Sequence, residues 1–64
     1  MAEQEAPSRR LAQREAADYL GISERALRRL RYEGGIAFYQ IGARVVYDTA
    51  DLDEYLEDNR VEAG

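Results

Sequence analysis

The segment Gly21-Ile22-Ser23 constrains the fold of this chain more than any other part of the sequence. It separates two stretches of helical spacing, one ending at Leu20 and one beginning at Glu24. Glycine favours the left-handed backbone that ends a helix, and serine is a preferred N-cap for the next one. So short a connection predicts a tight corner between two helices, which is typical of a helix-turn-helix.

The helix before this corner is expected to begin at Leu11 and to end at Gly21. Ala12 lacks the side-chain oxygen of a good N-cap, so its start is expected to be weak. The second helix is expected from Glu24 to about Glu33, where the next two glycines stop it. The apolar positions of the first helix are Leu11, Ala16, Tyr19 and Leu20.

The segment after the second helix changes period. Its β-branched and aromatic residues predict a β-hairpin with strands at about 37–41 and 44–47 around Gly42-Ala43. A third helix is expected at 50–59, capped by Asp48 or Thr49. Its apolar positions are Leu52, Tyr55 and Leu56.

This order of elements predicts a small α+β fold, a winged helix-turn-helix with a two-stranded hairpin as the wing. A two-stranded hairpin is not stable alone in water, so it must pack on the helices. We expect a flexible N-terminal arm over residues 1–9, one domain over residues 10–60 and a frayed C-terminus over residues 61–64.

The composition argues against an enzyme. The chain has 64 residues and contains neither Cys nor His, so it lacks the usual general base, thiol nucleophile and zinc ligands. The acidic residues 48–58 do not match the spacing of a Ca²⁺ loop. We expect no catalytic residue, metal site or cofactor. With no secretory signal or membrane-spanning run, a cytoplasmic protein without a membrane partner is expected.

Positive charge is concentrated in the first half of the chain, although the formal net charge is −4. Residues 8–34 hold seven Arg against four carboxylates, and residues 48–64 hold seven carboxylates against one Arg. A helical wheel places Ala26, Leu27 and Leu30 on one side of the second helix. It places Arg25, Arg28, Arg29 and Tyr32 on the other, with Arg31 on a flank.

This one-sign stripe predicts a DNA-binding face. Exposed helix faces are usually charged, but like charges four residues apart, as at Arg25 and Arg29, reduce helix stability. The planar guanidinium can hold phosphate or the guanine edge with two hydrogen bonds. Ser23, at the helix N-terminus, suits a phosphate, and Arg44 is placed at the wing tip. An acidic protein partner is the alternative.

The sequence also resembles a known family. The motifs "EAADYLGIS", "QIGAR" and "DLDEYL", in this order and spacing, are similar to the excisionase-like, MerR-related winged helix-turn-helix proteins. The similarity covers residues 11–56. It implies that the second helix, with Ser23, Arg25, Arg28, Arg29 and Tyr32, enters the major groove. It also implies that Arg44 on the wing meets the minor groove or backbone.

Members of this family include phage and mobile-element excisionases, or recombination directionality factors. They bind near attachment sites, bend DNA and direct an integrase towards excision in site-specific recombination. This chain most resembles a small actinobacterial phage excisionase. The resemblance therefore implies double-stranded DNA, further copies of the chain on adjacent sites and an integrase as partners, in a bacterial cytoplasm. Other members are small transcriptional regulators, which is the alternative.

The sequence departs from the family pattern in three places: the start of the first helix, the segment after the second helix, and the wing. Ala12 replaces the usual N-cap Thr, and Ala37 replaces a usual Pro. Uncharged or acidic residues stand where the family often has basic ones, so the recognition helix is expected to dominate binding. These positions are Gln40, Ala43, Val46 and Asp48.

Overall fold

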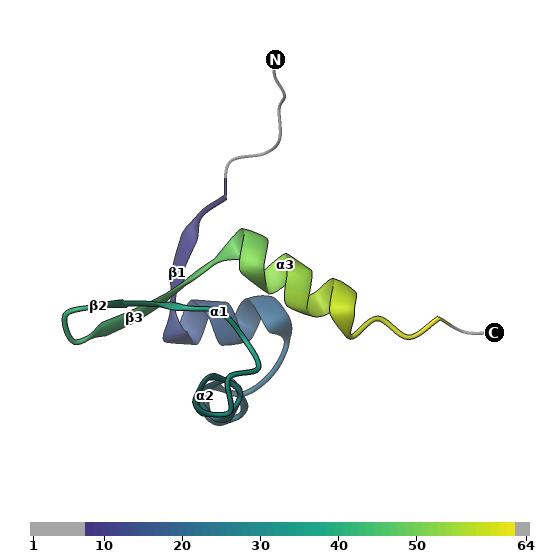
Figure 1. Cartoon of the computed structure of the whole chain (residues 1–64), viewed down its shortest axis with the longest axis horizontal. Coiled ribbons are helices and arrows are strands. Elements are labelled where there is room, and N and C mark those ends of the chain that lie inside the picture. The colour runs from purple at the N-terminus through teal and green to yellow at the C-terminus, as the bar shows by residue number, and fades with distance from the viewer. Residues whose placement is uncertain (1–7, 63–64) are drawn as a thin grey trace, which may run out of the picture.

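The computed structural model describes residues 8–62 and shows an α+β winged helix-turn-helix. The elements are β1 (Arg10–Ala12), α1 (Gln13–Leu20), α2 (Glu24–Tyr32), β2 (Tyr39–Ile41), β3 (Arg44–Asp48) and α3 (Thr49–Asp58). Figure 1 shows β3 running directly into α3, with the β2–β3 turn projecting beyond the helices on the left. The three helices and the hairpin wing are in the expected order.

The sheet has three antiparallel strands in the order β1-β3-β2, not the two expected. Leu11 lies in β1 opposite Tyr47, so the expected helix start at Leu11 is wrong. The helix begins instead at Gln13, with Ala12 as an N-cap that offers no side-chain oxygen. The backbone N–H of Ala12 donates to a Glu15 carboxylate oxygen at 3.2 Å, which supplies half of a capping box.

The third strand covers an edge of β3 that a hairpin alone would leave unpaired. It is held to the start of α3 through Arg9 and Thr49. The Arg9 N–H donates to Thr49 Oγ1 at 2.9 Å, and the Thr49 N–H donates to the Arg9 carbonyl at 2.8 Å. Most of the expected arm, residues 1–7, lies outside the described residues, while Ser8 donates to Asp48 at 3.4 Å.

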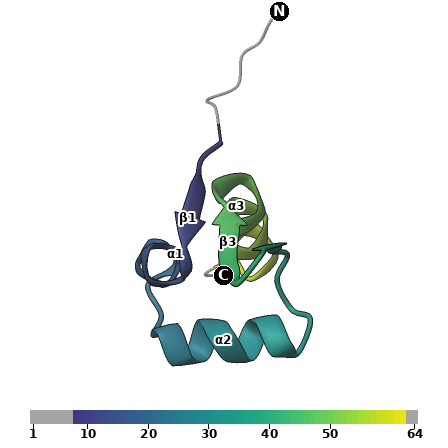
Figure 2. The same cartoon turned by 90° about the vertical axis from the view of Figure 1, so that its left-hand side faces the viewer.

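The corner between α1 and α2 is built from backbone hydrogen bonds. Gly21 has φ 75°, and its N–H donates to the Asp18 carbonyl at 3.1 Å. The Ile22 N–H donates to the Ala17 carbonyl at 3.0 Å. These bonds close the end of α1 and turn the chain at once into α2, as the glycine predicted. Figure 2 shows α2 lying across the bottom of the molecule, below β1, β3 and the other helices.

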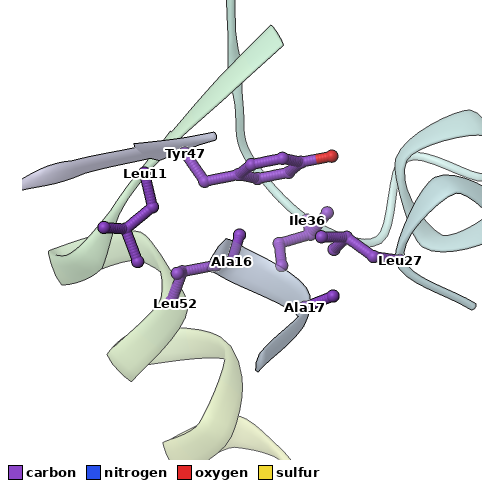
Figure 3. Close-up of a cluster of buried hydrophobic side chains, with 7 residues drawn as sticks. All are labelled: Leu11, Ala16, Ala17, Leu27, Ile36, Tyr47 and Leu52. Carbon is purple, nitrogen blue, oxygen red and sulfur yellow. The ribbon is translucent and has the colours of Figure 1, made fainter. Parts of the chain in front are cut away.

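One core joins the three helices to the sheet. Its buried members are Leu11, Ala16, Ala17, Leu27, Ile36, Tyr47 and Leu52 (Figure 3). Two alanines on α1, both almost fully buried, let this helix approach its neighbours closely. Asp48 caps α3 by accepting from the Ala50 N–H at 2.9 Å. Leu56, one of the expected apolar positions of α3, is 41% exposed and does not belong to this core.

Within residues 8–62, no helix combines the length and the apolar character needed to cross a membrane.

Candidate functional site

The N-terminus of α2 is fixed by Ser23. Its side-chain oxygen accepts from the Ala26 N–H at 3.0 Å, and its backbone carbonyl accepts from the Leu27 N–H at 3.0 Å. Ser23 therefore acts first as the N-cap of the helix. The side chain is exposed, so its O–H remains available as a donor to a ligand next to the helix N-terminus.

The two sides of α2 differ sharply in exposure. Leu27 is fully buried, and Ala26 and Leu30 are partly buried. The other side carries the exposed residues Arg25, Arg28, Arg29 and Tyr32. Because Leu27 on the opposite side packs into the core, this side of α2 faces outward, and α2 itself lies at the margin of the molecule in Figure 2. The structure thus gathers four of the predicted site residues on one accessible surface, named here the cationic face.

The arginines of the cationic face are not equivalent. Arg29 Nε lies 3.2 Å from a carboxylate oxygen of Glu33, the C-cap residue of α2, four residues later. Both side chains remain largely exposed, so the pair is weak and easily exchanged for another anion. Arg25 and Arg28 form no salt bridge with any residue in 8–62. Two guanidinium groups are therefore unneutralised, next to a third held by an exposed carboxylate.

Arg31 is directed inward, away from the cationic face. Its Nη1 donates to Gln13 Oε1 at 2.8 Å and to the Tyr47 hydroxyl oxygen at 3.0 Å. The hydrogen bond that Arg31 donates to Tyr47 is the main cause of an Arg31 pKa above its ordinary value, and desolvation opposes it. The helical wheel placed Arg31 on a flank of the helix. It could not show that Tyr47 of β3 and Gln13 of α1 accept its hydrogen bonds.

Arg44 begins β3, beside the tip of the wing, and is exposed. Side chains alternate along the strand, so it lies on the face opposite Tyr47 and the core. There it borders a shallow surface hollow of about 210 Å³ lined by Arg10, Ala12, Glu15, Ile41, Arg44 and Val46. The structure does not bring Arg44 into the cationic face: the predicted residues form one surface on α2 and a separate point on the wing.

Arg10 was not among the predicted site residues. It shares the hollow with Arg44 and places its Cζ 5.3 Å from the centre of the Tyr39 ring. Arg10 therefore adds a second positive charge beside the wing, whose own sequence carries little positive charge. The pairing of β1 with β3 creates this neighbourhood, and no local pattern around residue 10 indicates it.

In the part of the chain that the structure describes, no salt bridge joins the exposed carboxylates of α3 to α2. Among residues 8–62, no group of acidic side chains has the arrangement of a metal site. One of these carboxylates, Asp53, accepts from the Tyr19 hydroxyl on α1. This bond is the main cause of a Tyr19 pKa above its ordinary value. The acidic surface of α3 is thus solvent-exposed and partly engaged in contacts within the fold.

Comparison with known proteins identifies the family. No curated protein matches the chain. The helix-turn-helix domain family matches residues 13–60, from the first residue of α1 to just beyond α3. That span contains the corner, α2 and the wing, and helix-turn-helix domains bind DNA through such a second helix. The chain therefore belongs to the helix-turn-helix domain family, and its function is DNA binding.

Proposed function

We propose that this protein is an excisionase: it binds double-stranded DNA near the attachment sites of a phage or mobile element, bends it and directs an integrase towards excision. The observation that carries DNA binding is the cationic face of α2, exposed and largely free of internal ion pairs. The more specific role rests on the resemblance of residues 11–56 to excisionases.

In this proposal α2 enters the major groove. The groove of B-DNA admits one α-helix, and residues on its exposed side reach the base edges. Arg25, Arg28 and Arg29 supply the charge-assisted bonds to phosphate and guanine, and Tyr32, 76% exposed, supplies an aromatic surface beside them. Ser23 lies at the end of the helix that suits a phosphate.

The wing supplies the second contact. The β2–β3 turn projects from the body of the molecule (Figure 1), and Arg44 follows it directly. This position suits a phosphate or the minor groove beside the major groove that holds α2. With about five or six phosphates neutralised, log K should fall against log salt with a slope of about −4 to −5.

So few contacts favour binding by several copies on adjacent sites. The acidic α3 supplies a complementary surface for the basic side of a neighbouring copy or for the integrase. Its exposed carboxylates are Asp53, Glu54, Glu57 and Asp58. Opposite charges at such surfaces speed association and orient the partners. The protein would act on its DNA in the cytoplasm of a bacterial host.

An excision assay tests the role directly. A host with an integrated element and its integrase, but without this protein, is complemented with the parent chain or with Arg28→Ala, Arg29→Ala or Arg60→Ala. The last is a matched control, because Arg60 is exposed but lies beyond α3, near Glu57 and Glu62. We expect the parent and Arg60→Ala to restore excision, and the α2 variants to be impaired.

A gel-shift titration with attachment-site DNA separates the alternatives. If Arg28→Ala and Arg29→Ala bind as tightly as the parent, the assignment of the DNA face is wrong. Sequence-specific binding without stimulation of excision would assign a transcriptional regulator instead. If the parent binds no DNA, an acidic protein becomes the partner to seek for the cationic face.

A further inference from the structure

Three side chains from different elements meet in a closed triangle of hydrogen bonds, named here the Arg31 node. Arg31 of α2 donates to Gln13 of α1 and to Tyr47 of β3, and the Tyr47 hydroxyl donates to Gln13 Oε1 at 2.8 Å. The amide of Gln13 then donates to the Glu24 carbonyl at 3.1 Å. Gln13 thus reaches both the first turn and the last turn of α2.

The node lies at the edge of the core, with Tyr47 inside it. Tyr47 is 0% exposed, and Arg31 and Gln13 are partly buried. A hydroxyl in the core must have a hydrogen-bond partner, and the planar guanidinium of Arg31, at the edge of the core, binds its acceptors in fixed directions. Both needs are met only when α2 keeps one position relative to α1 and β3.

The guanidinium of Arg31 also contacts aromatic rings. Its Cζ lies 5.8 Å from the centre of the Phe38 ring, in the segment that leads into β2, and 5.2 Å from that of Tyr32. Phe38 in turn packs against Tyr47, with ring centres 6.4 Å apart. The side chain of Arg31 therefore links α2, which carries the cationic face, to β3 and to the segment that leads into β2.

We propose that Arg31 is a positioning residue, which fixes the distance and rotation of α2 relative to the wing so that both meet DNA together. This inference rests on the proposed DNA-binding site and adds to it a residue outside the contact surface. The charge of Arg31 is used inside the protein, held by Gln13 and Tyr47, and neutralises no phosphate. Loss of the node should weaken DNA binding without changing its dependence on salt.

Three variants test the proposal. Tyr47→Phe removes one hydroxyl and keeps the ring in the core, and Arg31→Met keeps an unbranched apolar stem without the charge. Tyr19→Phe is the matched control, because its hydroxyl joins α1 to α3 and does not touch α2. Dissociation constants for attachment-site DNA are measured over a series of salt concentrations, with Arg28→Ala for comparison.

We expect Arg31→Met and Tyr47→Phe to bind about tenfold more weakly, as loss of one or two hydrogen bonds implies. The slope of log K against log salt should be the same in these two variants as in the parent. In Arg28→Ala the slope should be smaller in magnitude by about 0.9, because one phosphate contact is lost. A slope lowered by the same amount in Arg31→Met would make Arg31 a phosphate contact and overturn the proposal. Parental affinity in both node variants would overturn it as well.

Amide hydrogen exchange tests, without DNA, whether the node holds α2 in place. In Tyr47→Phe, the amides of Leu27 and Leu30 should exchange faster than in the parent, and in Tyr19→Phe they should not. If the parent binds no DNA, the proposed function fails, and exchange in α2 still decides whether the node holds the helix. Unchanged exchange in Tyr47→Phe would show that it does not.

Discussion

Arg29 and Glu33 form an ion pair across one turn of α2, with Nε and Oε2 3.2 Å apart, on the surface proposed to meet DNA. The pair lies in the open, with side chains 79% and 59% exposed. Glu33 therefore competes with phosphate for Arg29 and also repels the DNA backbone. The free protein balances part of its own cationic face with this carboxylate.

Removing the carboxylate should strengthen DNA binding. Exposed ion pairs contribute about 0.2–1 kcal/mol, so we expect Glu33→Gln to bind roughly 1.5- to fivefold more tightly in a gel-shift titration. Glu62→Gln is the matched control, because it changes the net charge equally and removes the carboxylate from another exposed arginine pair, beyond α3. Equal tightening by both variants would assign the effect to overall charge, and no change in Glu33→Gln would exclude competition for Arg29.

The helices could be predicted from the sequence because their determinants are local. The caps Ser23 and Asp48, the glycine at 21 and the apolar spacing of α2 each act within one or two turns. Strand β1 could not be predicted in this way. Its three residues continue a helical apolar pattern, and only pairing with β3, more than 30 residues later, makes Leu11 extended.

The candidate site, too, could be predicted from the sequence only in part. The exposed side of α2 follows from its periodicity, so four of the predicted residues lie together. The inward direction of Arg31 could not be predicted, because its partners Gln13 and Tyr47 are distant in the sequence and meet it only in the folded chain. Arg10 lines the same hollow as Arg44 only because β1 pairs with β3. Leu56 fits the apolar spacing of α3, yet it is 41% exposed and lies outside the core.

The contrast between two leucines tests how much of the stability lies in the small core. Leu27 is 0% exposed, whereas Leu56 is 41% exposed. Leu27→Ala should lower the free energy of unfolding by about 2–5 kcal/mol, since a buried cavity results. Leu56→Ala should lower it by less than about 1 kcal/mol. Urea unfolding followed by circular dichroism measures both, and similar losses would contradict the core described here.

The corner between α1 and α2 depends on the backbone of Gly21. Its φ is +75°, and a Cβ built there meets no atom within 4 Å, so a substitution causes strain and no clash. Gly21→Ala should lower the free energy of unfolding by about 1 kcal/mol. Gly21→Asn, which tolerates this conformation better, should lose less. Thermal unfolding of the two variants checks this order, and the reverse order would contradict the strain argument.

The contact between Tyr19 and Asp53 gives a signal that depends on pH. The hydrogen bond to Asp53, followed by desolvation and the carboxylate charge, raises the Tyr19 pKa above 10.0, and the charge of Arg9 opposes this. The folded state therefore favours the protonated phenol. Its contribution to stability is complete below pH 10 and is lost as the pH rises through the higher pKa of the folded state.

Replacing Asp53 should lower this pKa. In Asp53→Ala, the Tyr19 phenol should titrate nearer its ordinary pKa, because the acceptor and the negative charge are both removed. In Arg9→Ala, the pKa should rise further, since the opposing charge is lost. The ¹³Cζ chemical shift of Tyr19, followed by NMR from pH 8 upward, reports each midpoint. The same midpoint in the parent and in Asp53→Ala would show that the carboxylate does not hold the phenol in solution.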